Sequence, residues 1–172
     1  MQDASQRKSS RKYLRTDSLP PEYFIDSNVF VNARILDKKY GSSCAVIMRE
    51  LTTKRLSAAT STLAILEVSN ALRKLGMSDD VVDEVRAIYS TGIVVHELLN
   101  VDVRLTAELF GISRVSPYDC LHAAIMKRTG LDTIISTDPE FEKIPQIVRV
   151  DPLAYKPMAG KKAGHEARPT RV

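Results

Sequence analysis

Apolar segments of two kinds alternate along this chain. Short runs of consecutive apolar residues, typical of strands buried on both faces, precede longer segments with apolar residues every three or four positions, typical of helices. The expected strands are residues 23–25, 56–60, 92–98, 132–137 and 146–150. The expected helices are residues 29–36, 42–54, 61–76, 78–90, 100–111 and 116–130. This alternation predicts an α/β domain whose mostly parallel sheet of about four or five strands is covered by helices on both faces.

Several helix boundaries are marked by residues that favour helix ends. The last helix is the clearest case, because Ser116 is a suitable N-cap, Pro117 suits the first helical position and Gly130 suits the end. The other expected N-caps are Ser42 or Ser43, Thr60 or Ser61, and Ser78. Gly76 and Gly111 are expected to end the helices that precede them.

Composition indicates a soluble, cytoplasmic protein of one domain with two tails. The 172 residues are 44% hydrophobic and include neither a long uninterrupted apolar run nor an apolar N-terminal signal region, so we expect no membrane association. The two cysteines, Cys44 and Cys120, have no zinc-type spacing and suit a reducing cytosol.

The positive charge of the chain is concentrated at its two ends. The net charge is +4, of which residues 1–20 carry +3 and residues 156–172 carry +4, so residues 21–155 carry −3. We therefore expect basic, disordered tails at 1–21 and 156–172 around a folded domain at 22–155. Basic tails attract polyanions such as RNA, although solvated ends without a ligand have the same composition.

Four acids occupy special positions in this pattern. Asp26 and Asp138 directly follow hydrophobic strands, and ligands of open parallel sheets bind at the carboxyl ends of strands. Asp119 falls in the first turn of a helix. Glu67 lies at the flank of a core stripe in its helix. That expected stripe consists of Ala64, Val68, Ala71 and Leu75.

Each acid alone has an ordinary structural explanation. Asp26 and Asp138 could be turn or cap residues, and Asp119 could complete a capping box with Ser116. Glu67 could pair with Arg73 or Lys74. Four converging carboxylates without matched bases would, however, repel one another, and a divalent cation relieves that repulsion. Mg²⁺ and Mn²⁺ prefer carboxylate oxygen and water as ligands.

The segments around these acids resemble a PIN-domain ribonuclease. They are YFIDSNVF around Asp26, ILEVSNAL around Glu67, SPYDCLHAAIM around Asp119 and ISTDPEF around Asp138, in the order and spacing of that family. The resemblance covers about residues 22–152 and is greatest to VapC-type toxins of toxin–antitoxin pairs. It implies a PIN-like three-layer α/β/α fold and a metal-dependent endoribonuclease. It further implies an RNA substrate, a homodimer and inhibition by a cognate antitoxin protein.

The expected site consists of the four acids and their polar neighbours. Asp26, Asp119, Asp138 and Glu67 are the expected catalytic and metal-binding residues, holding one or two Mg²⁺ or Mn²⁺ ions. Hydrogen bonds to these carboxylates or to the scissile phosphate are expected from Ser27, Asn28, Ser136 and Thr137. His122, one helical turn from Asp119, could be a ligand, but an oriented core or rim histidine is favoured.

Three other functions remain to be weighed against the toxin. The basic tails are not part of the minimal PIN domain and leave room for an RNA-processing nuclease outside toxin–antitoxin pairs. A non-catalytic RNA-binding module has no need for a costly acidic cluster. Phosphatases of the haloacid dehalogenase type need a second Asp two positions after the first, where this chain has Asn28.

Overall fold

The structure of the protein is a computed structural model that describes residues 20–157 of the 172-residue chain. The expected disordered tails lie almost entirely outside the described residues. Within the described range, no helix is long and apolar enough to cross a membrane.

Five short strands form one sheet in the order β3-β2-β1-β4-β5, and every neighbouring pair is parallel. The strands are β1 (Tyr23–Ile25), β2 (Ala58–Ser61), β3 (Val94–His96), β4 (Thr133–Ile135) and β5 (Val148–Val150). The first strand of the chain therefore lies at the centre, so that β1 has a neighbour on each side. The predicted parallel sheet is confirmed, with all five expected strands present.

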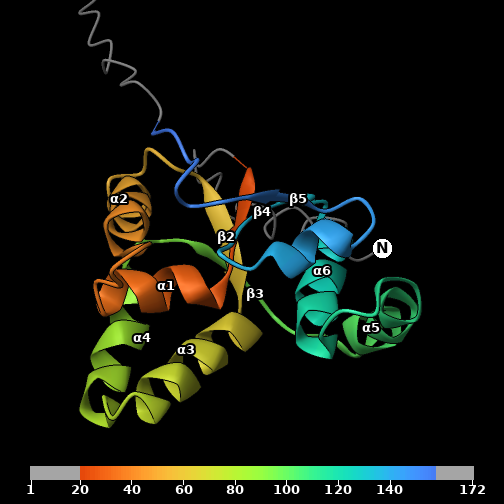
Figure 1. The fold of residues 1–172 in the computed structure, drawn as a ribbon, viewed down its shortest axis with the longest axis horizontal. Helices are drawn as coiled ribbons and strands as arrows, with labels where there is room; N and C mark the ends of the chain where they lie inside the picture. The colour runs from red at the N-terminus through yellow and green to blue at the C-terminus, as the bar shows by residue number, and fades with distance from the viewer. Residues whose placement is uncertain (1–19, 158–172) are drawn as a thin grey trace, which may run out of the picture.

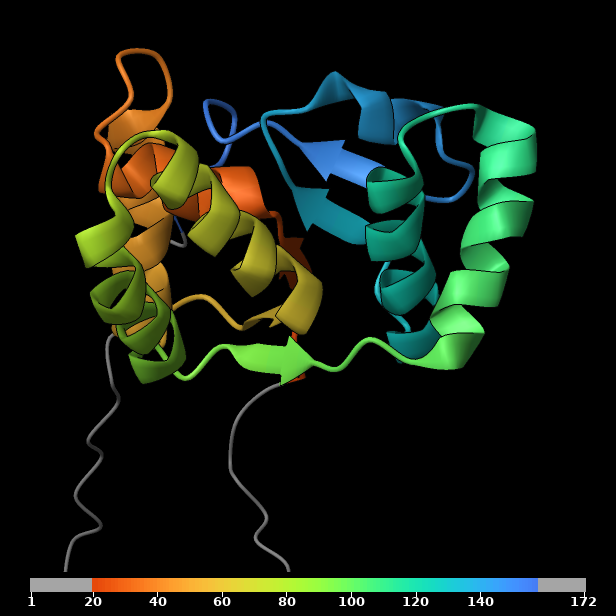
Figure 2. The same cartoon turned by 90° about the horizontal axis from the view of Figure 1, so that it is seen from below.

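Helices cover both faces of this sheet and give three layers (Figures 1 and 2). The helices α1–α4 pack on one face, and α5 and α6 pack on the other. Their bounds are α1 (Ser27–Arg34), α2 (Gly41–Thr52), α3 (Thr62–Lys74), α4 (Val81–Ser90), α5 (Asn100–Ser113) and α6 (Pro117–Thr129). Two 3-10 helices complete the fold, η1 (Ser78–Asp80) and η2 (Pro139–Lys143).

The alternation of side chains along the strands divides the core into two clusters. Phe24, Ala59 and Ile134 point toward the side of α5 and α6. Their chain neighbours Ile25, Ala58 and Ile135 point toward the side of α1–α4. Both sets are buried, as the continuous apolar runs in the strands predict for a sheet covered on both faces. The buried free cysteines Cys44 and Cys120 belong to different clusters, so they lie on opposite sides of the sheet.

The helix boundaries agree with the sequence where a side chain caps the helix. Ser116 caps α6, Pro117 opens it, and Gly130 ends it at a φ of 77°. Ser61 accepts a hydrogen bond from the N–H of Ala64 at the start of α3. The expected caps of α2 and α4 were wrong.

Local turns explain why these two helices begin at residues other than those that the sequence predicts. The Asp37 carboxylate accepts hydrogen bonds from the N–H groups of Lys39 and Tyr40, and α2 begins directly after this turn, at Gly41. A Cβ at Gly41 would lie 2.5 Å from the carbonyl carbon of Leu36, so the tight turn needs glycine. Ser78 caps no helix but opens η1, and α4 follows from Val81.

Three further expectations from the hydrophobic pattern were also wrong. The strand that contains His96 is not buried, because β3 is an edge strand and Val94 is 42% exposed. Leu75 does not belong to the core stripe of α3, since it follows the last helical residue and is 54% exposed. Gly111 lies inside α5, which ends instead where Arg114 adopts a left-handed φ of 59°.

A buried ion pair ties α6 to the segment that leads from β3 into α5. The Arg128 guanidinium donates to both oxygens of Asp102, at 2.6 and 3.0 Å, and to the carbonyl oxygen of Glu97 at 2.7 Å. Asp102 is 1% exposed and also accepts from the N–H of Leu99 at the start of α5. Since α6 carries Asp119 and His122, this contact helps to fix two of the polar side chains considered below.

Replacing Asp102 by alanine should destabilise the fold strongly. The change would leave a partly buried Arg128 without its carboxylate and α5 without a cap, so the free energy of unfolding should fall by about 3 kcal/mol. Urea denaturation measures this difference. The matched control is Asp83→Ala, because the side chains of Asp83 and its partner Arg86 are 76 and 77% exposed. This substitution should change the free energy of unfolding by less than about 0.5 kcal/mol. Equal losses in the two variants would contradict the assignment.

Candidate active site

Asp26 both caps a helix and stands at the centre of a buried polar network. Its backbone N–H extends the β1–β4 pairing by donating to Ile135 O at 3.1 Å, and its carboxylate accepts from the N–H of Ser27 at 2.7 Å at the start of α1. The residue is only 5% exposed. The capping role and the position at the sheet edge are therefore compatible, because one oxygen serves the helix while the other faces different partners.

The second carboxylate oxygen of Asp26 links two segments that are far apart in the sequence. Ser136 Oγ donates to Asp26 Oδ2 at 2.6 Å, and Asn28 Nδ2 donates to the same oxygen. Asn28 also donates to Ser136 Oγ at 3.0 Å and accepts from the N–H of Thr137 at 3.1 Å. Together with Ser27, whose hydroxyl lies 3.3 Å from Asp26 Oδ1, these contacts bring the four expected polar neighbours together around one acid.

Asp138 is joined to this network through its backbone. Its N–H donates to Ser136 Oγ at 3.0 Å, and its carboxylate caps η2 by accepting from the N–H of Glu140 at 2.9 Å. Like Asp26, it combines a capping role with a position beyond the carboxyl end of a strand, three residues after the last residue of β4.

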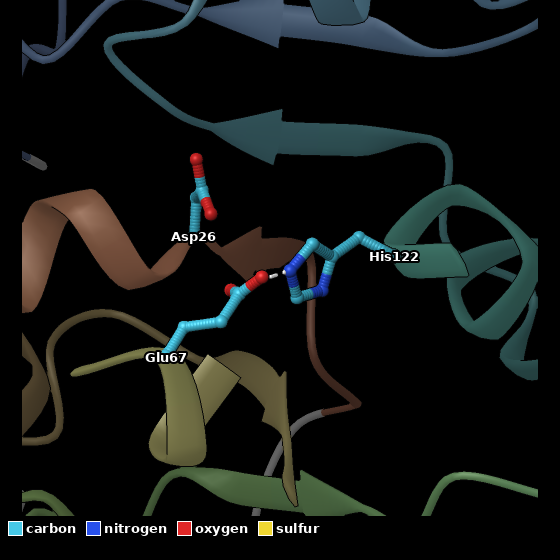
Figure 3. Close-up of side chains that lie close together, drawn as sticks. All are labelled: Asp26, Glu67 and His122. Carbon is cyan, nitrogen blue, oxygen red and sulfur yellow. Dashed lines mark hydrogen bonds and ion pairs between the residues drawn. The ribbon is translucent and has the colours of Figure 1, made fainter. Parts of the chain in front are cut away.

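Glu67 reaches the same edge of the sheet from α3 and meets a histidine from α6 (Figure 3). His122 Nε2 lies 2.8 Å from Glu67 Oε2, and the imidazole is only 1% exposed. Arg73, the basic neighbour that could have neutralised Glu67, instead donates to Asn70 at 2.9 Å. The favoured interpretation of His122, an oriented core histidine, agrees with this contact.

Asp119 lies in the first turn of α6 without a capping role. Ser116 Oγ accepts from the N–H of Tyr118, and among residues 20–157 the Asp119 carboxylate has no hydrogen-bond partner. Burial, followed by the charges of Asp138 and Asp26, raises the pKa of Asp119 to about 7. The capping box with Ser116, which the sequence left open as an alternative, is therefore absent, and the charges of Asp138 and Asp26 act on the carboxylate.

The same electrostatic setting affects the other groups of the site. Burial raises the pKa of Asp26, although His122 and the Ser136 hydroxyl oppose the effect. Burial also tends to raise the pKa of Glu67, but the hydrogen bond and charge of His122 outweigh it, and the pKa is lowered. For His122, burial is outweighed by the Glu67 hydrogen bond and by nearby acids, so its pKa is raised. The Glu67–His122 pair is thus stabilised in its charged form.

The arrangement of oxygen atoms fits a hard divalent cation. Ligand atoms of Asp26, Glu67 and His122 all lie within 4.8 Å of one another, which is close enough for one ion. His122 Nε2 is engaged with Glu67, so the imidazole orients that carboxylate, and the carboxylate oxygens remain as the donors that Mg²⁺ or Mn²⁺ prefers. Asp119 and Asp138 do not join this tight group, but the charge of Asp138 contributes to the raised pKa of Asp119.

His122 lies in the same group of ligand atoms as Asp26 and Glu67, although the sequence does not place it among the expected site residues. The available signal was its spacing of three residues from Asp119, which places both on one side of α6. Its partner could not be inferred, because Glu67 lies 55 positions away in the chain. Whether any of the four acids binds metal remains a prediction.

The parallel α/β/α fold places this chain among the α/β proteins whose ligands bind at the carboxyl ends of the strands, where its acids lie. A family model narrows this class, since the PIN domain model matches residues 23–147. The chain therefore belongs to the PIN domain family. A search of curated proteins gave no match.

Several solved structures share the fold at low sequence identity. The VapC20 toxin of Mycobacterium tuberculosis, described as cleaving the sarcin–ricin loop, has a TM-score of 0.60 at 16% identity, covering 70% of this chain and 93% of its own. The DNA-bound VapBC of Salmonella typhimurium has a TM-score of 0.59 at 20% identity, with coverage of 77 and 98%. The promoter-DNA-bound VapBC2 of Rickettsia felis has a TM-score of 0.59 at 16% identity, with coverage of 74 and 96%. At these identities the likeness establishes the fold.

Neutralising Asp119 should stabilise the metal-free protein at high pH. The pKa of Asp119 is about 7 in the folded protein against 3.8 for an aspartate side chain free in water, so its ionisation lowers stability as the pH rises through this interval. Solvent screens the half-buried group, and Asp119→Asn should raise the free energy of unfolding by on the order of 1 kcal/mol at about pH 8 and by almost nothing at about pH 4.

Chemical denaturation in the presence of a chelator measures this pH profile. The control is Asp132→Asn, an exposed acid at the other end of β4, which should leave the profile unchanged. A profile for Asp119→Asn that runs parallel to that of the unmodified protein would show that Asp119 is not strained by its neighbours.

Proposed function

We propose that this protein is a metal-dependent endoribonuclease whose active site is built from Asp26, Glu67, Asp119 and Asp138. The observation that carries the proposal is the gathering of these acids at the carboxyl edge of the sheet in a PIN domain. The pKa of Asp119 is raised to about 7 by burial and by the charges of Asp138 and Asp26, which is the electrostatic state that a bound cation would relieve.

The four acids would divide the work of holding the ion and the water. Asp26 and Asp138 are the proposed direct ligands, while Asp119 binds directly or through water. Glu67, held by His122, orients the attacking water. The chemistry supplied by bound Mg²⁺ or Mn²⁺ is activation of that water and stabilisation of charge on the phosphate and the leaving oxygen.

The polar neighbours would keep the ligands in place. Ser136 and Asn28 donate to Asp26, and Ser136 accepts from the Asp138 N–H. Such contacts orient metal ligands and tune their basicity. Ser27 and Thr137, at the rim of the same network, are the proposed contacts to the scissile phosphate.

RNA as the substrate and an antitoxin as the partner are supported by the structural relatives. One relative is described as a toxin that cleaves the sarcin–ricin loop, and two are VapBC structures. We accordingly propose a cytoplasmic, homodimeric toxin of a VapBC-type pair. Exposed apolar side chains on α3 and α4, such as Leu66 and Val82, provide surface that a protein partner could cover.

A nuclease that processes RNA outside such a pair is the second candidate. It is favoured by the basic ends of the chain, which carry +3 in residues 1–20 and +4 in residues 156–172. Positive charge at the two ends of the chain can collect RNA through salt-dependent phosphate contacts without an antitoxin. Both candidates share the catalytic site and differ in partner.

Replacing Asp26 by asparagine should abolish cleavage of single-stranded RNA. The amide keeps the shape of the side chain but loses the charge that binds metal, and the rate should fall roughly a thousandfold or more. Cleavage would be followed with Mg²⁺ or Mn²⁺, with and without chelator, and thermal unfolding would verify that the variant is folded.

Two results would contradict this assignment in different ways. If the Asp26→Asn variant is folded and cleaves at the rate of the unmodified protein, Asp26 acts only as a helix cap. RNA that is retained but left intact by the unmodified protein would favour a non-catalytic binding module. Asp132→Asn serves as the control and should cleave normally.

Metal should stabilise the folded protein through the same acids. Binding to the native state alone raises the free energy of unfolding by about 2.7 kcal/mol at one hundred times the dissociation constant. Thermal unfolding with Mn²⁺ against chelator measures this gain. In the triple variant Asp26→Asn, Asp119→Asn and Asp138→Asn, the gain should vanish.

A second triple variant separates site binding from general charge effects. It carries asparagine in place of three exposed acids, Asp79, Asp83 and Asp132. This protein should retain the full stabilisation by Mn²⁺. A metal effect that survives unchanged in the first triple variant would place the ion elsewhere.

A further inference from the structure

Arg149 is an arginine of β5 whose side chain is turned inward at the edge of the sheet. The side chain is only 12% exposed, although β5 is an edge strand. Its guanidinium contacts three different acceptors. This degree of burial and pairing is unusual for a residue at an edge position and calls for a specific role.

The guanidinium binds both sides of the segment that contains Asp138. Nη1 donates to the carbonyl oxygen of Ser136 at 2.9 Å. Nε and Nη2 both lie close to Glu142 Oε1, at 2.8 and 2.7 Å. Nη1 also contacts Asp151 Oδ2 at 3.1 Å, which fixes the orientation of the group.

Ser136 is therefore held by β5 through both of its backbone polar groups. Its N–H donates to Val150 O at 3.2 Å, while its carbonyl accepts from Arg149. The Ser136 hydroxyl meanwhile bridges the Asp26 carboxylate and the Asp138 N–H. A displacement of Ser136 would consequently displace the contacts of both proposed ligands.

The Glu142 contact fixes the other end of the segment. Glu142 lies in η2, the 3-10 helix that the Asp138 carboxylate caps. Ser136 lies two residues before Asp138, and Glu142 lies four residues after it. The single guanidinium of Arg149 therefore binds the chain on both sides of this acid. The planar fork of arginine suits this task, because a lysine ammonium cannot reach acceptors in several fixed directions with the same geometry.

From these contacts we infer that Arg149 is a positioning residue, which holds Ser136 and Asp138 in the geometry that binds a divalent cation together with Asp26. The inference rests on the proposed function. It adds a residue of β5 to a site otherwise built from β1, β4, α3 and α6.

Mn²⁺ affinity can be measured by calorimetry on the full chain. The direction in which it changes when Arg149 is replaced distinguishes a positioning role from the alternatives. Removing a positive charge near a cation site would by itself tighten Mn²⁺ binding, and a purely structural role would leave the affinity unchanged. Loss of positioning weakens binding, and we expect about tenfold weaker Mn²⁺ binding for Arg149→Met. Unchanged or tighter binding would overturn the inference.

Arg149→Lys keeps the charge and provides a second variant if Arg149→Met does not fold. Because the ammonium cannot hold Ser136 and Glu142 together, Mn²⁺ binding should again weaken. A Mn²⁺ affinity equal to that of the unmodified protein would show that the positive charge alone is sufficient. The matched control is Arg55→Met, which removes another guanidinium bound to a buried carboxylate, that of Glu50 at 2.7 Å, just before the start of β2 and away from the carboxyl ends of the strands. It should leave Mn²⁺ affinity unchanged, and an equal loss there would also overturn the inference.

Amide hydrogen exchange provides a readout that requires neither metal nor cleavage. In Arg149→Met and Arg149→Lys, the N–H groups of Asp138 and Glu140 should exchange at least about tenfold faster than in the unmodified protein, because their acceptors are released. If the exchange rates of these two N–H groups are the same in the variants as in the unmodified protein, the positioning role of Arg149 is contradicted.

These measurements separate the inference from the nuclease proposal. An unmodified protein that binds Mn²⁺ and shows the Arg149 effects, yet leaves RNA intact, would contradict the nuclease while retaining the positioning role. An unmodified protein that binds no Mn²⁺ would overturn both. In an active enzyme, kcat at fixed subsaturating Mn²⁺ should fall about tenfold in Arg149→Met, with the KM for RNA changed less than twofold.

Discussion

The burial of carboxylates close to one another at one edge of a parallel sheet is the constraint on which the rest of this structure depends. Burial and the charges of Asp138 and Asp26 raise the pKa of Asp119 to about 7, and burial raises that of Asp26. Such a group persists only where the surrounding fold holds the acids in place. The rest of the domain provides that support through capping, hydrogen bonding and packing.

Helix capping is one of these supports, and it explains why structural and functional interpretations of the acids need not compete. Asp26 caps α1 with one oxygen, and Asp138 caps η2 in the same way. The positive end of a helix favours a negative charge, so each cap partly offsets the cost of burying its acid. A carboxylate has two oxygens, which leaves the other one of Asp26 for Ser136 and Asn28.

The Glu67–His122 pair is a second support and has a different physical basis. The buried imidazole of His122 outweighs the effect of burial and lowers the pKa of the Glu67 carboxylate that it contacts, and this carboxylate raises the pKa of His122 in return. The rings of Phe24 and Phe141 lie 5.8 and 6.5 Å from it between centroids, so the imidazole is held within the core. Glu67 is thereby kept ionised and oriented, while the Asp119 carboxylate is left without a hydrogen-bond partner among residues 20–157.

The sequence by itself determined the parallel α/β architecture, the position of Asp26 and Asp138 at strand ends and the start of α6 at Ser116. These features follow from local periodicity and capping preferences, which act over a few residues. Tertiary structure alone decided that β3 lies at an edge of the sheet, and hence its exposure. It also decided that His122 contacts Glu67, which lies 55 positions away in the sequence, and that Arg149 binds the segment that contains Asp138. Contacts of this kind depend on the packing of distant elements, which leaves no pattern in the neighbouring residues.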